Sequence, residues 1–373
     1  MDRFELIATA AFGLEGLVAR ELARLGIEAK AENGGARFFG SFEDAFRANL
    51  HARCADRILL VMGRFEARSF EALFEGVRAL PWEDFIGEHT RFPVNGKCAR
   101  SQLMSVRDCQ AITKKAIVER LRGRYRTDWF VEDAETVSID VALHGDVAQL
   151  TLDASGTALN RRGYRTWNGE APLRETLAAA LVSLSPWRPG MPLHDPMCGT
   201  GTLMIEAAMR MAHRAPGLTR EFAIESWRNM PTEAFGDIRE QARAEFDPSR
   251  IEGISGSDID PRAVRLARRH AERAGVGNAV RFDTADVRDF KSALPEGVVV
   301  TNPPYGERLL EKREAEELYR VFGRAVRDLP PKWRVLVLSS HTEFERSFGR
   351  PAVKKRKLYN GMIKCDAFFY GGK

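Results

Sequence analysis

The chain has 373 residues, of which 44% are hydrophobic and 29% are charged, with a formal net charge of +5 and a pI near 9.0. This length predicts two or three domains. No segment approaches the roughly 18 apolar residues that a membrane-spanning helix needs, and the acidic residues within the first apolar segment argue against a secretory signal. We therefore expect a cytoplasmic protein. Its positive charge suits a polyanionic partner without identifying one.

The cysteines and histidines are scattered along the chain. Five cysteines occur without a C-x-x-C pair, and the seven histidines form no H-x-x-x-H pair. Zinc sites and disulfide frameworks depend on closer or more regular spacing. We expect reduced thiols and no metal site.

Residues 1–65 alternate short strands with amphipathic helices. The hydrophobic pattern predicts strands at 4–10, 36–41 and 58–67 and helices at 13–26 and 41–55. Ser41, followed by acidic residues, fits the N-cap of the second helix. So many elements in so short a segment indicate a small α+β domain.

Residues 66–160 give a second compact α+β pattern. Helices are predicted at 69–80 and 105–125, a strand at 91–99, and two alternating strands over 136–155. The turn His144-Gly145-Asp146 joins the last two strands as a hairpin. The polar, arginine-rich stretch at 160–175 then reads as a linker into a third region.

Residues 161–373 alternate short apolar strands with helices, which is typical of a doubly wound, mostly parallel α/β sheet. Strands are predicted within 191–195, 251–258, 279–286, 297–301 and 333–340. Asn360-Gly361 lies between two alternating runs near the C-terminus, a strong signal for a hairpin. We therefore expect a Rossmann-like domain whose sheet ends in an antiparallel strand.

A glycine-rich turn follows the first strand of this third region. In Asp195-Pro196-Met197-Cys198-Gly199-Thr200-Gly201, the two glycines let the backbone approach a ligand closely. Dinucleotide sites place a phosphate here and favour a third glycine. Asp195 would repel a phosphate but would attract an amine, so the turn predicts S-adenosylmethionine over NAD or FAD, with a plain structural turn as the alternative.

Two further acidic residues follow the next strands. Asp258 could accept hydrogen bonds from the ribose hydroxyls of the cofactor, and Asp286 could meet the adenine amine. Asp260 precedes Pro261 and is better explained as a helix cap.

The motif Asn302-Pro303-Pro304-Tyr305 directly follows the fourth strand. Two prolines fix the backbone and withhold N–H groups, so carbonyl oxygens face outward as acceptors. Together with the Asn302 side chain they could hold a planar amine and stabilise the charge that grows as nitrogen attacks a methyl group. Tyr305 offers a face for stacking a base. The alternative is a proline turn with no catalytic role. The position of the motif directly after the fourth strand argues against that alternative.

Two basic clusters are candidates for phosphate contact. For both clusters the alternative is charge that is simply exposed to solvent. That alternative is the preferred interpretation of a third basic segment, the arginine-rich helix after Pro261. The candidate RNA-binding residues are Arg161, Arg162, Arg165, Lys354, Lys355, Arg356 and Lys357.

The segments DPMCGTGTLMIEAA, GSDIDPRAVRLARRHAERAG and TNPPYGERL together resemble the THUMP-domain class I S-adenosylmethionine-dependent RNA methyltransferases. The resemblance is greatest to bacterial 23S rRNA guanine-N2 methyltransferases of the RlmL type. It implies a ferredoxin-like segment at 1–65, a THUMP RNA-binding domain at 66–160 and a methyltransferase domain with an N-terminal linker at 161–373.

The resemblance also implies roles for individual residues. It assigns Asn302, Pro303, Pro304 and Tyr305 to catalysis, and Asp195, Pro196, Gly199, Gly201, Asp258, Asp286 and Asn302 to cofactor binding. Some large rRNA enzymes of this type carry a second methyltransferase domain, whereas tRNA guanine-N2 enzymes share the shorter layout. A tRNA enzyme, a DNA adenine-N6 enzyme and a non-catalytic assembly factor therefore stay open as alternatives.

Overall fold

The computed structural model describes residues 3–127, 129–165, 173–305 and 309–371. The chain divides into two compact units. Unit 1 comprises Met1–Ala10, Val18–Leu159 and Arg220–Glu240, and unit 2 comprises Ala11–Leu17, Asn160–Thr219 and Gln241–Lys373. Within the described residues, no helix is both long and apolar enough to span a bilayer.

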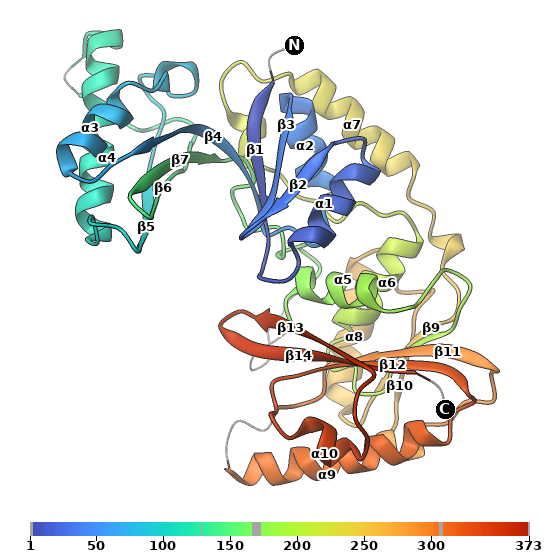
Figure 1. The fold of residues 1–373 in the computed structure, drawn as a ribbon. Helices are drawn as coiled ribbons and strands as arrows, with labels where there is room; N and C mark the ends of the chain where they lie inside the picture. The colour runs from blue at the N-terminus through green and yellow to red at the C-terminus, as the bar shows by residue number, and fades with distance from the viewer. Residues whose placement is uncertain (1–2, 128, 166–172, 306–308, 372–373) are drawn as a thin grey trace. The chain divides into compact units, whose positions relative to one another are not determined.

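A seven-stranded sheet forms the centre of unit 1, with strand order β2-β3-β1-β4-β7-β6-β5 (Figure 1). All neighbouring strands are antiparallel except β5 and β6. The strands are β1 (Phe4–Thr9), β2 (Ala29–Glu32), β3 (Gly35–Gly40), β4 (Arg57–Glu66), β5 (Val94–Ala99), β6 (Ile139–His144) and β7 (Val147–Asp153).

Strand β4 belongs to both of the predicted α+β regions. Leu60 pairs with Leu6 of β1 on one side and with Leu152 of β7 on the other. Between Val61 and Gly63 the register shifts, which marks a bulge. The two regions therefore share one continuous sheet.

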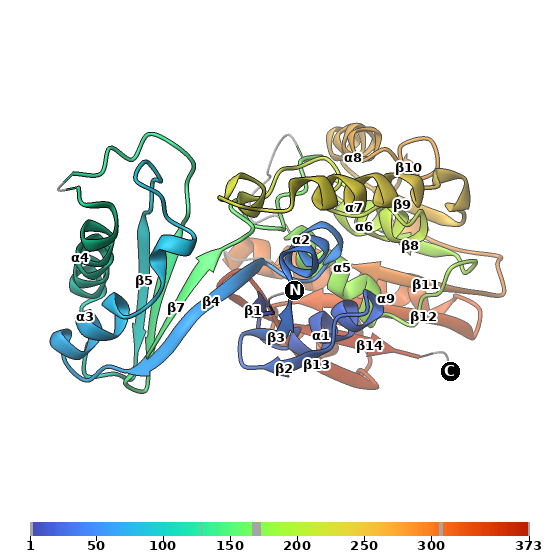
Figure 2. The ribbon, with the colours of Figure 1, turned by 90° about the horizontal axis from the view of Figure 1, so that it is seen from above.

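Helices accompany this sheet, and the sequence predicted all of them except α7. They are α1 (Glu15–Arg24), α2 (Phe42–His51), α3 (Phe70–Arg78) and α4 (Val106–Tyr125), with α7 (Thr232–Ala244) returning from later in the chain. Ser41 caps α2 in a capping box with Asp44, which confirms the expected N-cap. Figure 2 shows α7 beside α2, where the ring of Phe235 stacks on Phe46 at 4.5 Å.

Unit 2 contains a second seven-stranded sheet, ordered β10-β9-β8-β11-β12-β14-β13. The first five strands are parallel and β14 is antiparallel to both of its neighbours, as predicted. The strands are β8 (Leu193–Asp195), β9 (Ile254–Asp258), β10 (Arg281–Thr284), β11 (Glu296–Thr301), β12 (Lys332–Ser339), β13 (Lys354–Asn360) and β14 (Ile363–Tyr370).

Helices cover both faces of this sheet. Figure 1 shows α9 and α10 on one face and α5 and α6 on the other. The helices are α5 (Glu175–Leu184), α6 (Thr202–Met211), α8 (Pro261–Arg273), α9 (Leu309–Arg327) and α10 (Phe344–Phe348). Four short 3-10 helices complete the described part of the chain: η1 (Trp82–Asp84), η2 (Ala223–Ser226), η3 (Pro248–Arg250) and η4 (Val287–Asp289).

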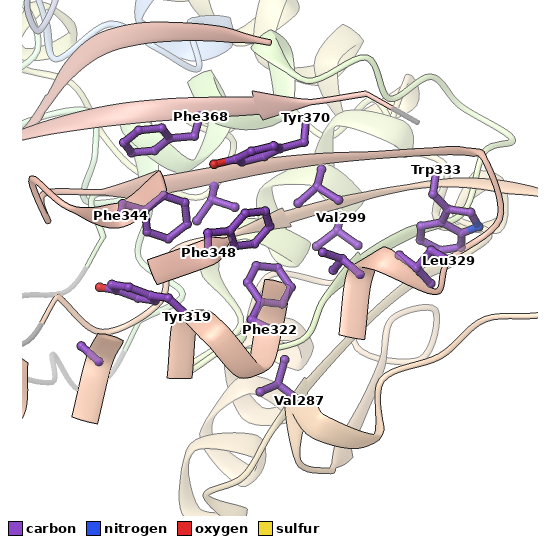
Figure 3. Close-up of a cluster of buried hydrophobic side chains, with 14 residues drawn as sticks. Val287, Val299, Tyr319, Phe322, Leu329, Trp333, Phe344, Phe348, Phe368 and Tyr370 are labelled. Carbon is purple, nitrogen blue, oxygen red and sulfur yellow. The ribbon is translucent and has the colours of Figure 1, made fainter. Parts of the chain in front are cut away.

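An aromatic core fills the space between α9, α10 and the sheet (Figure 3). Tyr319 and Phe322 extend from α9 toward Phe344 and Phe348 of α10. The helices approach so closely that a Cβ on Gly323 would lie 2.0 Å from a backbone oxygen of α10. This packing fixes α9 against the strand that leads into the Asn-Pro-Pro-Tyr motif.

Candidate active site

The glycine-rich turn joins β8 to α6 through a backbone that only glycine adopts easily. Gly199 has φ +52° and Gly201 has φ +83°, both in the left-handed region. A Cβ on Gly201 would also lie 2.9 Å from the side chains of Ala267 and Phe282. Cys198 N donates to Ser257 O at 2.9 Å, which ties the turn to β9. The turn is thus held in a fixed shape at the carboxyl ends of two strands.

Asp195 ends β8 and is only 2% exposed. Its Oδ1 accepts a hydrogen bond from Met197 N at 3.1 Å. Burial raises the pKa of Asp195 to about 7, and the negative charge of Asp258 adds to the effect. A cationic group next to Asp195 would restore the ionised form.

Asp258 lies beside the glycine turn at the end of β9. Its Oδ2 accepts from Gly199 N at 2.8 Å, and its Oδ1 accepts from Asp260 N at 2.9 Å. Asp260 caps α8 by accepting from Arg262 N at 2.8 Å, which confirms its predicted structural role. Each oxygen of Asp258 keeps a second lone pair with which it can accept another hydrogen bond.

Asp286 caps η4 and carries an ionic partner that the sequence pattern did not predict. Its Oδ1 accepts from Arg288 N at 2.9 Å, and its Oδ2 accepts from the Arg288 guanidinium at 2.6 Å. The hydrogen bond from Arg288 lowers the pKa of Asp286 below its usual range. The carboxylate is therefore ionised at neutral pH.

The Asn-Pro-Pro-Tyr motif leaves β11 and is braced from two directions. The Tyr305 hydroxyl donates to Asn302 Oδ1. The Tyr319 hydroxyl, from α9, donates to Pro304 O at 2.6 Å, and Cys365 Sγ of β14 lies 3.7 Å from the Tyr305 hydroxyl. The two phenols stay protonated, because burial raises the pKa of Tyr319 to about 12 and that of Tyr305 well above its usual range.

One cavity of about 910 Å³ joins the glycine turn to this motif. Among the predicted site residues, its walls include Asp195, Pro196, Gly199, Asp258, Asp286, Asn302, Pro303, Pro304 and Tyr305. Gly201 is absent from this wall and shapes the turn behind it. The residues predicted to bind a cofactor and those predicted to act on a base therefore share a single cavity.

The first basic cluster differs from the prediction. Arg162 is buried, with a side chain 2% exposed, and its Nε lies 3.4 Å from the Glu206 carboxylate in the interior. This placement contradicts the prediction that Arg162 contacts RNA, because a buried guanidinium cannot reach a phosphate. The side chain of Arg165 is 8% exposed and lies on the cavity wall. Arg161 is exposed.

The second basic cluster lies on strand β13, at the edge of the sheet. Lys355 forms an ion pair with Glu345 at 2.7 Å, and Arg356 donates to Gly13 O. Lys354 lies over the ring of Phe369, and the side chain of Lys357 is exposed. Their contact with RNA stays a prediction.

Two residues that act on the site were missed at the sequence level. Tyr319 holds the Pro304 carbonyl, and Arg288 pairs with Asp286. A tyrosine in an amphipathic helix carries no signal that distinguishes a core residue from one that positions a loop. The nearness of Arg288 to Asp286 in the sequence could have suggested their pairing.

Three family models match the chain. An RlmL ferredoxin-like domain matches residues 5–59, a THUMP domain matches 67–153, and an RMKL-like methyltransferase domain matches 162–368, more than half of the chain. The chain belongs to the RMKL-like methyltransferase family. The resemblance found in the sequence is confirmed, and unit 2 has the fold of S-adenosylmethionine-dependent methyltransferases.

Two named relatives match almost the whole of this chain. "Putative RNA methyltransferase YpsC" of Bacillus subtilis (strain 168) is 44% identical over 375 residues, covering 100% of this chain and 97% of that protein. "Ribosomal RNA large subunit methyltransferase K/L" of Syntrophotalea carbinolica is 38% identical over 376 residues, covering 97% of this chain. The match covers 52% of that protein, so this chain spans about half its length.

A solved structure extends the comparison to three dimensions. "SMU.472, a putative methyltransferase complexed with SAH" has 40% sequence identity and a TM-score of 0.94, covering 100% of this chain and 99% of that one.

Proposed function

We propose that this RMKL-like methyltransferase transfers a methyl group from S-adenosylmethionine to the exocyclic N2 amine of a guanine in structured RNA, with 23S rRNA as the leading substrate. The observation that carries the proposal is the cavity that joins the glycine turn to the Asn-Pro-Pro-Tyr motif. A methyl donor and a flat base must meet in one space, and this cavity supplies one.

The cofactor would lie across the carboxyl ends of β8, β9 and β10. Asp195 faces the methionine ammonium, Asp258 the ribose hydroxyls and Asp286 the adenine edge. The ammonium would favour the ionised form of Asp195. The charge-assisted hydrogen bond between the two groups would offset the free-energy cost of burying the carboxylate charge. Pro196 and Gly199 allow close approach of the backbone.

The target amine would donate its two hydrogens to Asn302 Oδ1 and Pro303 O. The hydroxyl of Tyr305 already donates to Asn302 Oδ1, which sets the amide so that its oxygen is the acceptor in the cavity. A carbonyl oxygen has two lone pairs and can accept from the amine as well. Pro304 O is held by Tyr319, so the motif keeps its shape as the base enters.

When bound, S-adenosylmethionine would supply the methyl group on its sulfonium, which the nitrogen lone pair of the base would accept as the bond from carbon to sulfur breaks. Positive charge would then grow on the nitrogen. Asn302 Oδ1 and Pro303 O stabilise that growing charge, and the surplus proton then passes to water. The chain contributes position and electrostatics and no covalent intermediate.

Unit 1 would hold the RNA. The THUMP match and the names of the two relatives support an RNA substrate, which would place the enzyme in the cytoplasm. We keep the predicted division into a ferredoxin-like segment at 1–65, a THUMP domain at 66–160 and a methyltransferase domain at 161–373. The target base would leave its stack to reach the cavity in unit 2.

To test the proposal, the full chain is incubated with isotopically labelled S-adenosylmethionine and one of four substrates. These are 23S rRNA, 16S rRNA, total tRNA and double-stranded DNA. Nucleoside mass spectrometry then identifies the product. N2-methylguanosine from 23S rRNA supports the proposal. The same nucleoside from tRNA alone would move the substrate to tRNA, N6-methyladenine in DNA would overturn the RNA assignment, and failure to bind the cofactor would overturn the enzymatic role.

A further inference from the structure

The hairpin of β13 and β14 extends past the carboxyl end of β12. Strand β14 is antiparallel to β12, and Asp366 of β14 pairs with Ser339, the last residue of β12. The part of β14 that precedes Asp366, and the turn before it, therefore lie beyond this edge of the sheet. The cavity lies at the same edge, because Asp195, Asp258 and Asn302 stand at the carboxyl ends of the parallel strands.

Two aromatic residues hold this hairpin in place within unit 2. Cys365 Sγ of β14 lies 3.7 Å from the hydroxyl of Tyr305, which brings the hairpin into contact with the Asn-Pro-Pro-Tyr motif. On β13, the ring of Tyr359 packs edge-on against the ring of Phe12 at 5.9 Å. The hairpin is therefore a supported element next to the motif.

The turn of the hairpin presents a large apolar side chain to solvent. Asn360 pairs with Ile363, which leaves Gly361 and Met362 at the tip. Gly361 has φ +65°, a conformation that tight hairpin turns favour. Met362 is 97% exposed, so its side chain hardly contributes to the packing of the protein. A flexible thioether at a supported tip can enter a partner molecule.

The strands that carry this tip are strongly basic. Residues 353–365 contain four lysines, one arginine and no acidic residue. Lys357 of β13 and Lys364 of β14 are exposed. Cations along both strands favour a phosphate backbone, and an apolar tip between them fits the faces of stacked bases. The charge and shape of the hairpin therefore match a base-paired or stacked region of RNA.

We propose that Met362 enters the base stack of the RNA and fills the space that the target guanine leaves, while Lys357 and Lys364 contact the flanking phosphates. This inference rests on the proposed methylation of structured RNA and adds how the base is extruded. An extruded base leaves a gap between its neighbours, and an apolar side chain in that gap offsets part of the free energy lost on unstacking. The tip is close to Cys365 in the sequence, and so to the motif that would receive the base.

Single-turnover methylation of two matched RNA fragments tests the role of Met362. The first fragment contains the base that wild type methylates, with its natural neighbours. The second has abasic sites in place of both neighbours, so no stack has to be broken. On the first fragment, Met362→Ala should be about 10-fold slower than wild type, whereas Met362→Leu, which keeps the apolar bulk, should stay within about 2-fold. On the second fragment the three proteins should react at equal rates.

Two further variants are the controls. Val353→Ala shortens another exposed apolar side chain, 82% exposed just before β13, and should match wild type on both fragments. Lys364→Gln should weaken binding of both fragments alike and lower the salt dependence of binding by about one counterion, because a phosphate contact does not depend on the stack. All four variants should bind S-adenosylhomocysteine as wild type does, which shows that they are folded.

The outcomes separate this inference from the proposed function. Transfer by Met362→Ala at the wild-type rate on the first fragment, an equal loss on both fragments, or an equal loss in Met362→Leu overturns the role of Met362 and leaves the proposed function intact. An unchanged salt dependence in Lys364→Gln overturns the phosphate contact. If wild type methylates no RNA, the proposed function fails, and this inference fails with it.

Discussion

Burial of Asp195 is unfavourable for its ionised form, and the same residue has a proposed role in cofactor binding. Its pKa is raised by burial to about 7, so between pH 4 and pH 7 the folded state holds a proton that the unfolded state releases. Stability of the ligand-free protein therefore falls as pH rises through this interval, by up to about 4 kcal/mol for a shift of this size. Bound ammonium would remove the cost, because it favours the ionised carboxylate.

We expect Asp195→Asn to raise the melting temperature of the ligand-free protein at pH 8 and to weaken binding of S-adenosylhomocysteine. In wild type, affinity should increase with pH up to about 7 and then level off, because binding must first remove the proton. The variant should lack this rise. Thermal melts and calorimetry across pH 5.5 to 8.5 measure both effects, and parallel pH profiles for the two proteins would contradict the role of Asp195.

Tyr319 is expected to act through Pro304, since its hydroxyl donates to that carbonyl at 2.6 Å. Tyr319→Phe should lower kcat about tenfold by loosening the motif, with cofactor affinity unchanged. Tyr370→Phe is the control, because that buried hydroxyl belongs to the same core and has no hydrogen-bond partner within the described residues. Equal losses of kcat in the two variants would mean that Tyr319 is only a core residue.

At the scale of elements, periodicity predicted the strands and helices that have one apolar face. It missed β2, whose sequence Ala29–Glu32 alternates without a hydrophobic residue larger than alanine. It also missed α7, a largely polar helix whose Phe235 finds its partner, Phe46, far away in the sequence. Such elements depend on contacts across the chain, which a local pattern does not contain.

The same limit explains which of the predicted residues could be placed together in the fold from the sequence and which could not. Motifs at strand ends meet wherever a parallel sheet forms, so Asp195, Asp258 and Asn302 could be placed in one cavity from spacing alone. A cluster of arginines carries no information on which members are buried. Arg162 finds Glu206 on α6, and only the folded chain shows that pair.

The packing of α9 against α10 supports the Asn-Pro-Pro-Tyr motif, because α9 carries Tyr319, which donates to Pro304 O. Gly323→Ala would place a Cβ 2.0 Å from Phe348 O, and we expect this overpacking to destabilise the protein by about 1–3 kcal/mol. Gly236→Ala in α7 is the matched control, with nothing near its Cβ, and should stabilise by about 0.5–1 kcal/mol. Denaturant titration measures both, and similar midpoints for the two variants would contradict the close contact.

At the scale of the whole molecule, RNA binding and cofactor binding should respond differently to salt. Contacts with phosphate release counterions, so RNA affinity should fall steeply as KCl rises from 50 to 200 mM, by about 10-fold or more. Cofactor affinity should change less, because its proposed contact with Asp195 is buried. Filter binding and calorimetry at matched salt measure the two, and a common salt dependence would contradict separate binding modes.

The most direct test of the account is single-turnover methylation by Asn302→Ala, with cofactor binding measured on the same preparation. The account predicts that the variant binds S-adenosylmethionine and RNA as wild type does, yet transfers methyl at least about 100-fold more slowly, because the amine loses its main acceptor. Transfer at the wild-type rate would contradict it.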